Sequence, residues 1–236
     1  MFKQTYSQAA AKQLIFIPAT RLQQSFVAAI EKKTLIWLAG RTPGWINSDQ
    51  LTLMGFVAQC LAGVSYALAR WNRYMLLLGI GFLALNWLGD SMDGTLARVR
   101  NCQRPRYGFY VDHIADTIAA LFLMGGLALS EYIHPAIAVG LLIAFLMLSI
   151  EAYLATYTLG QFQLSYWKFG PTEIRLLLAL GNLALLRWPT AKINLMSVPL
   201  RLLDLGGAVG MIGMALMLIV SAIQHTRKLY REEKIS

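Results

Sequence analysis

Residues 74–98 read YMLLLGIGFLALNWLGDSMDGTLAR, and residues 107–129 read YGFYVDHIADTIAALFLMGGLAL. In each stretch the acidic residues gather at one end, and a long apolar run forms the rest. An α-helix needs about 20 apolar residues to cross the hydrocarbon core of a bilayer. The two stretches therefore predict consecutive membrane-spanning helices whose acidic ends lie on the same side of the membrane.

The composition of the whole chain supports this prediction. Of its 236 residues, 57% are hydrophobic and 14% are charged, and the mean hydropathy is +0.52. Soluble domains are about 45–50% apolar and about 25% charged, so these values exclude a disordered chain and an ordinary soluble enzyme. The two cysteines, Cys60 and Cys102, exclude a disulfide scaffold and show no zinc-site spacing.

Six apolar segments predict an all-α membrane protein, a six-transmembrane-helix bundle formed by residues 47–225. The segments are 51–69, 74–92, 107–129, 134–157, 173–188 and 200–223, of which the fifth is the shortest. Residues 226–236 are predicted to form a basic tail. A glycine series at residues 206, 210 and 213 permits close helix packing, either within the chain or in a homodimer.

Residues 1–46 are predicted to form an N-terminal region with an amphipathic interfacial helix. Its apolar positions recur at helical spacing, and its charged and amide residues take the other face. The apolar residues are Leu22, Phe26, Val27 and Ile30, and the polar ones are Arg21, Gln23, Gln24, Glu31, Lys32 and Lys33. A soluble helix packed on the bundle is the alternative interpretation.

The basic residues predict the orientation of the bundle. The chain has 21 Lys and Arg against 12 Asp and Glu, a net charge of +9. These cations flank apolar segments, so membrane orientation and anionic headgroups explain them better than nucleic acid does. Most lie in residues 1–46, in the loop after the second segment and in the tail. We therefore expect an integral, multi-pass protein with both termini in the cytoplasm, and the short chain favours a prokaryotic plasma membrane.

The acidic ends of the second and third segments carry the strongest chemical signal. Asp90, Asp93, Gly94 and Ala97 share one helical face, and Gly108, Asp112 and Asp116 share another. Carboxylates that converge repel one another unless protons or cations intervene, and oxygen ligands favour Mg²⁺ or Mn²⁺ over zinc. The small residues clear space beside the acids for a ligand. Asn86 lies one turn before Asp90 on the same face, as support for the site or as a hydrogen-bonding group in the bundle.

The same residues form a recognisable pattern. The string Asp90-x2-Asp93-Gly94-x2-Ala97-Arg98-x9-Gly108-x3-Asp112-x3-Asp116 resembles the signature of the CDP-alcohol phosphatidyltransferases, with a slightly longer spacer after the arginine. Upstream, residues 45–52 resemble the family's Pro-Asn-x-x-Thr element, although Ser48 and Asp49 replace the first two residues.

The resemblance implies an enzyme that transfers a substituted phosphate from a CDP-linked donor to an alcohol and releases CMP. It implies that Asp90, Asp93 and Asp112 bind the metal, and that Asp116 is the general base and a further metal contact. It also implies a CDP site, which we expect at Gly94, Ala97, Arg98, Gly108, Asp49 and Thr52. The donor is either CDP-diacylglycerol or a CDP-amino alcohol, and the partners are the alcohol acceptor and membrane lipids.

Three polar residues near the predicted cytoplasmic ends of the fourth and fifth segments are candidates for an acceptor pocket: Glu151, Glu173 and Arg175. A packed acid, a surface pair or helix capping are the alternative interpretations of these residues. Two other functions are compatible with clustered membrane carboxylates, a Mg²⁺-dependent aspartate-rich prenyltransferase and a cation transporter. The small residues between the acids argue against the first, and the clustering of the acids at one face argues against the second.

Overall fold

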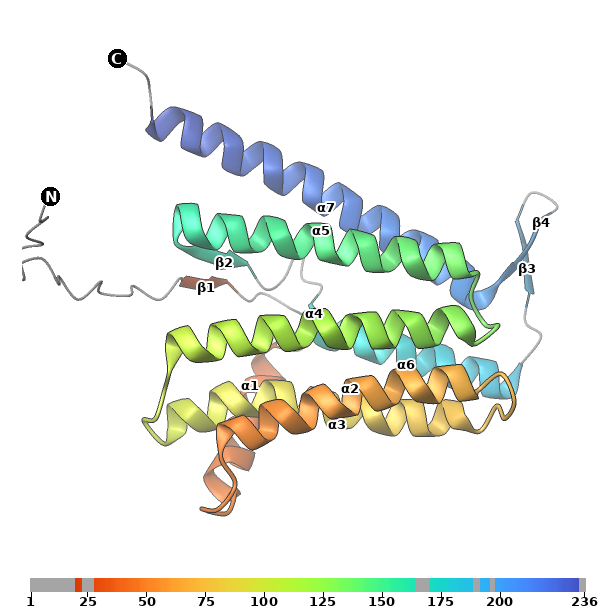
Figure 1. Cartoon of the computed structure of the whole chain (residues 1–236), viewed down its shortest axis with the longest axis horizontal. Helices are drawn as coiled ribbons and strands as arrows, with labels where there is room; N and C mark the ends of the chain where they lie inside the picture. Colours follow the sequence, from red (N-terminus) through yellow and green to blue (C-terminus); the bar gives the residue numbers. More distant parts are fainter. Residues whose placement is uncertain (1–19, 23–27, 164–169, 189–191, 196–197, 234–236) are drawn as a thin grey trace, which may run out of the picture.

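The computed structural model describes residues 20–22, 28–163, 170–188, 192–195 and 198–233. Helices make up the architecture, and four short strands lie in the connections. The helices are α1 (Ala28–Arg41), α2 (Ser48–Leu68), α3 (Met75–Val99), α4 (Pro105–Leu129), α5 (Pro135–Leu159), α6 (Pro171–Arg187) and α7 (Leu202–Glu232). From α2 to α7 the chain runs back and forth along one bundle (Figure 1).

Five helices of the described part of the chain are long and apolar enough to cross a membrane: α2, α3, α4, α5 and α7. The chain is therefore an integral membrane protein, as predicted. The fifth predicted segment corresponds to α6, which has 17 residues and covers only part of the bundle's length (Figure 1). At about 1.5 Å per residue it is about 25 Å long, less than a hydrocarbon core of about 30 Å. The predicted count of six spans is thus not confirmed.

Close approach of α2 to its neighbours positions the site. A Cβ on Gly89 of α3 would lie 2.6 Å from the backbone of α2 at Leu51 and Gly55. A Cβ on Gly63 of α2 or on Gly126 of α4 would overlap the backbone of the other helix. Small residues let helix backbones approach closely in membranes, where apolar burial alone does not drive association. These contacts hold α3 and α4 against the same helix.

A buried polar cluster ties α6 into the bundle. Asn182 of α6 is fully buried, and its side-chain oxygen accepts a hydrogen bond of 2.9 Å from the Tyr66 hydroxyl of α2. Its amide group lies 3.5 Å from the carbonyl oxygen of Leu76 in α3. Paired polar groups of this kind are tolerated in an apolar interior because each finds a partner.

Two helices extend beyond the predicted apolar segments. α3 continues to Val99, so the acidic pattern lies on a helix throughout. α7 continues to Glu232, so most of the predicted tail is helical. Hydropathy marks where a chain leaves the membrane, whereas Arg, Lys and Gln favour a helix beyond that point.

The N-terminal region differs from its prediction. Thr20–Leu22 form a short strand, β1, paired in parallel with β2 (Gln161–Gln163), and α1 begins only at Ala28. Glu31 was predicted on the polar face of the helix, but it is buried against the bundle. Phe26 and Val27 lie outside the described residues, and an amphipathic interfacial helix is not confirmed. The other strands, β3 (Lys192–Leu195) and β4 (Val198–Arg201), form an antiparallel hairpin before α7.

Candidate active site

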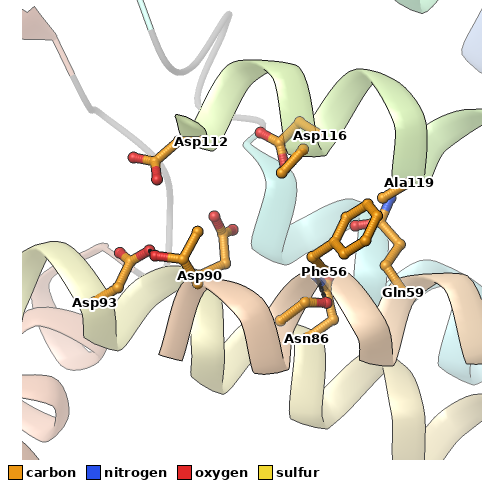
Figure 2. A pocket seen from close by; sticks show the side chains of 11 residues that line it. Phe56, Gln59, Asn86, Asp90, Asp93, Asp112, Asp116 and Ala119 are labelled. Carbon is orange, nitrogen blue, oxygen red and sulfur yellow. Dashed lines mark hydrogen bonds between the residues drawn. The ribbon is translucent and has the colours of Figure 1, made fainter. Parts of the chain in front are cut away.

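Four carboxylates from two helices line one pocket. Asp90 and Asp93 project from α3, and Asp112 and Asp116 face them from α4, as the one-face spacing predicted (Figure 2). The rest of the lining comes from α2, α3 and α4: Thr52, Gly55, Phe56, Gln59, Asn86, Ala115 and Ala119. The structure thus brings together carboxylates that are separated by the whole loop between α3 and α4.

Asp93 is held by hydrogen bonds to both of its oxygens. The Thr52 hydroxyl of α2 donates to Oδ2 at 2.6 Å, and the backbone N–H of Gly94 donates to Oδ1. The residue is 7% exposed. Hydrogen bonds to an ionised carboxylate are stronger than neutral ones. Thr52, predicted to contact the donor, is therefore placed where it orients a carboxylate of the pocket.

Arg175 brings a positive charge to the same carboxylates. From α6 its Nη2 donates to Asp90 Oδ2 at 2.7 Å, and its Nε donates to Asn86 Oδ1 at 2.7 Å. Asn86 in turn donates to the carbonyl oxygen of Gly55 at 3.0 Å. The Arg175 side chain is 15% exposed and that of Asp90 is 36% exposed, so solvent screens this ion pair in part. This arginine was predicted in an acceptor pocket, and the structure places it directly at the carboxylates.

The pocket suits a hard divalent cation by the chemistry of its ligands. The titratable side chains that line it are all aspartates, whose carboxylate oxygens are the ligands that Mg²⁺ and Mn²⁺ prefer. Within the described residues, however, no three Asp, Glu, His or Cys side chains are close enough together to hold one ion. The carboxylates face a common space, and binding of an ion requires them to move closer to it.

Four of the six residues expected to bind CDP lie beside the pocket, toward the end of α3 and the start of α4. They are Gly94, Ala97, Arg98 and Gly108. A Cβ on Gly108 would have no neighbour within 4 Å, so the space next to this glycine is open. A Cβ on Gly94 would meet only the end of the Arg98 side chain, at 3.4 Å. Arg98 is exposed and donates to the Thr95 hydroxyl at 3.0 Å. Ala97 is half-buried on the same turn.

Asp49 does not line the pocket. It forms an ion pair with Arg104 in the loop before α4, and the two side chains are about half exposed, 49% and 54%. The hydrogen bond to this carboxylate raises the pKa of the Arg104 guanidinium. The structure therefore gives Asp49 a surface contact between the start of α2 and the loop, apart from the carboxylates.

The two remaining acceptor candidates are placed away from the pocket lining. Glu151 of α5 contacts α7, where the Ser221 hydroxyl donates to it at 3.1 Å and His225 Nδ1 lies 2.6 Å away. Glu173 accepts a hydrogen bond of 2.8 Å from the backbone N–H of Gly170 and so caps α6. Of the three candidates, only Arg175 reaches the carboxylates.

Sequence reasoning missed five residues that line the pocket: the small residues Gly55, Ala115 and Ala119, and the larger Phe56 and Gln59 of α2. A signal was present, because Gln59 is a polar residue within an apolar segment and lies seven residues after Thr52, on the same helical face. In Figure 2 the side chains of Phe56 and Gln59 occupy the end of the pocket away from Asp93 and Asp112.

Comparison with known proteins agrees with this geometry. The model of the CDP-alcohol phosphatidyltransferase family matches residues 45–223, which include α2 to α6, most of α7 and the whole carboxylate pocket. No curated protein matches the chain. Because the match covers most of the sequence, the chain belongs to the CDP-alcohol phosphatidyltransferase family.

Proposed function

We propose that the protein is a Mg²⁺- or Mn²⁺-dependent transferase. It transfers a substituted phosphate from a CDP-linked donor to an alcohol acceptor and releases CMP, a reaction of phospholipid synthesis. The single observation that carries the proposal is the pocket of Asp90, Asp93, Asp112 and Asp116 between α3 and α4, inside the region of the family match. That match favours this function over the prenyltransferase and the transporter.

Bound metal supplies charge neutralisation for the pyrophosphate of the donor and for the CMP that leaves. Asp90, Asp93 and Asp112 are the proposed ligands. Thr52 and the Gly94 N–H fix the Asp93 carboxylate from two sides, and Arg175 fixes Asp90. Holding these two carboxylates in place leaves fewer groups to reorganise when the ion and the substrates bind, which favours catalysis.

Asp116 is the proposed general base. It lies on the same face of α4 as Asp112, one turn further from the helix start, and lines the pocket with Gln59 and Ala119 (Figure 2). An acceptor hydroxyl in this part of the pocket could pass its proton to the Asp116 carboxylate as the hydroxyl oxygen attacks the donor phosphorus. A positioned base contributes about 10²–10⁴-fold to such a rate.

The nucleotide of the donor is proposed to lie over Gly94, Ala97 and Gly108, where the helices present small side chains. Arg98, on the last turns of α3, can supply a charge-assisted contact to a phosphate. The donor is CDP-diacylglycerol or a CDP-amino alcohol. The carboxylates lie toward the end of the bundle where α3 ends and α4 begins, which the distribution of basic residues predicts to face the cytoplasm.

The direct test is release of CMP by the purified protein in detergent or lipid nanodiscs. Labelled CDP-diacylglycerol and CDP-amino alcohols are each incubated with Mg²⁺ and a panel of alcohols, with EDTA as the negative control. The proposal predicts that at least one pair gives CMP and a new lipid in equal amounts, only with metal. The Glu131→Gln variant, changed at an exposed acid outside the pocket, should match the wild type. No CMP from any pair would contradict the proposal.

A further inference from the structure

Glu31 is one of the most buried charged residues of the described chain, although it lies outside the carboxylate pocket. It is 8% exposed and shares one face of α1 with Leu35 and Ala39, which are 6% and 3% exposed. This face packs against α3. The spacing of Glu31, Leu35 and Ala39 at four-residue intervals makes the charged residue part of the packed stripe.

One oxygen of Glu31 accepts hydrogen bonds from two other helices. In α3, Trp87 Nε1 donates to Oε1 at 2.7 Å and the Ser91 hydroxyl donates to it at 3.1 Å. In α6, the Thr172 hydroxyl donates to the same oxygen at 3.0 Å. Glu31 therefore joins α1, α3 and the first turn of α6 at a single atom.

Two of the donors are close in sequence to Asp90 and to Arg175, which form an ion pair. Ser91 follows Asp90 in the chain, and Thr172 lies one turn before Arg175 on α6. Arg175 spans the same junction between α6 and α3, because its Nη2 lies 2.7 Å from Asp90 Oδ2. The contacts of Glu31 thus fix the part of α6 from which Arg175 reaches the carboxylates.

The apolar packing of α1 on α3 does not by itself explain a glutamate at this position. Its second oxygen, Oε2, is buried and has no hydrogen-bond partner in the described part of the chain. A buried carboxylate oxygen without a partner is destabilising, whereas an apolar side chain would avoid that cost but leave Trp87 Nε1 and the hydroxyls of Ser91 and Thr172 without this acceptor. What the glutamate adds is an acceptor that fixes the positions of the three donors.

We propose that Glu31 is a positioning residue for the transfer reaction. By accepting hydrogen bonds from Ser91 and Thr172, it fixes the start of α6 on α3 and holds Arg175 against Asp90. Glu31 does not line the pocket and takes no part in the chemistry. The effect on transfer rests on the proposed function, whereas the effect on the order of α6 does not.

The test compares variants that remove the hydrogen bonds with one that keeps them. Glu31→Leu removes the acceptor, Thr172→Val removes only the donor of α6, and Glu31→Gln retains one acceptor oxygen. Leu35→Ala is the matched control, because it loosens the same face of α1 without touching these hydrogen bonds. Hydrogen exchange of residues 170–178 is measured in the metal-free proteins, together with thermal midpoints and CMP release.

We expect faster exchange at the start of α6 in Glu31→Leu and Thr172→Val, but not in Leu35→Ala, whatever the changes in thermal midpoint. In Glu31→Leu, kcat/KM is expected to fall about tenfold or more, since small displacements of a positioning group have effects of this size or larger. Glu31→Gln should restore most of the rate. Since Glu31 acts through Arg175, adding Glu31→Leu to Arg175→Gln should lower the rate no further.

Normal exchange of residues 170–178 in Thr172→Val and in any Glu31→Leu that folds would overturn the inference. The inference would also be overturned if the fold-losses in rate of Glu31→Leu and Arg175→Gln multiplied in the double variant, as they do for independent sites. If the wild type transfers nothing to any acceptor, the proposed function fails, while the exchange measurement still decides whether Glu31 orders α6.

Discussion

Replacing Thr52 with valine tests whether the orientation of Asp93 matters for transfer. The substitution keeps the shape of the side chain and removes the hydroxyl that donates to Asp93 Oδ2 at 2.6 Å. The hydroxyl also contacts the carbonyl oxygen of Ser48 at 3.1 Å, within its own helix, and that contact is dispensable to the helix. The principal loss is therefore one hydrogen bond to a carboxylate that is 7% exposed.

The size of the effect follows from the strength of that bond. Hydrogen bonds to charged groups contribute about 1.5–3 kcal/mol, and each 1.4 kcal/mol corresponds to about a tenfold change. If Thr52→Val removed the whole contribution of this hydrogen bond to the stability of the transition state, the rate would fall by about 10- to 150-fold. Because the Gly94 N–H still donates to the other oxygen of Asp93, we expect a value near the lower end, about tenfold.

The assay is CMP release at saturating donor and acceptor, repeated over a range of Mg²⁺ concentrations. Thr52→Val should lower kcat and require more Mg²⁺ for half-maximal rate. The matched control is Ser65→Ala. It removes a hydroxyl of the same helix that, among the described residues, donates to the carbonyl oxygen of Leu61, within its own helix. If Thr52→Val and Ser65→Ala both retain the wild-type rate and Mg²⁺ requirement, Thr52 does not orient a working carboxylate.

Asp116→Asn removes the proposed base, so it is expected to lower the transfer rate about 10²-fold or more and to retain CDP binding. If calorimetry shows that CDP affinity falls together with the rate, Asp116 is a metal ligand instead. Gly94→Leu should abolish CDP binding, because the leucine fills the space beside the carboxylates. Gly81→Leu, on an open face of the same helix, should leave CDP binding unchanged. Equal CDP affinities of the two variants would mean that Gly94 serves helix packing alone. Gly63→Ala should lower the free energy of unfolding by about 1–3 kcal/mol, because its Cβ would overlap the backbone of α4. The Cβ of Gly125→Ala would have no neighbour within 4 Å, so this variant should change the free energy of unfolding little. Equal free energies of unfolding of the two variants in denaturation experiments would contradict the packing argument.

The pocket was predictable where it depends on local spacing. Asp90 and Asp93 stand three residues apart and Asp112 and Asp116 four, so any helix places each pair on one face. Helices joined by a short loop run antiparallel and bring their acidic ends together. The glycines that allow the close approach, Gly55 against Gly89, have no such local signature, because their contact depends on how two helices cross.

Long-range contacts account for what the sequence analysis missed. Arg175 reaches Asp90 from α6, and no pattern in either segment specifies that partner. Glu31 was predicted on a polar helical face, because flanking lysines place the charged side toward water. In the structure its hydrogen bonds to Trp87, Ser91 and Thr172 compensate for part of its desolvation. Burial of a charge depends on partners that local sequence does not reveal.

The two helices that extend beyond their predicted apolar segments, α3 and α7, do so for the same reason. Apolar segments report burial in lipid, whereas helix ends depend on backbone hydrogen bonds and helix propensity. α7 therefore continues through Arg227, Lys228 and Arg231, beyond its apolar run. α6, in contrast, agrees with its predicted segment 173–188 within two residues: it starts at Pro171, where a proline at the first position favours a helix start, and it is the shortest helix from α2 to α7.

The central claim is that the carboxylates between α3 and α4 bind a divalent cation that is required for transfer from a CDP-linked donor. The most direct measurement is CMP release by Asp93→Asn across a Mg²⁺ titration, beside the wild type and Glu131→Gln. We predict that wild type and Glu131→Gln are silent in EDTA and recover together with Mg²⁺, while Asp93→Asn stays inactive although its helices remain folded by circular dichroism. Full transfer by Asp93→Asn at ordinary Mg²⁺, or transfer by the wild type in EDTA, would contradict the account.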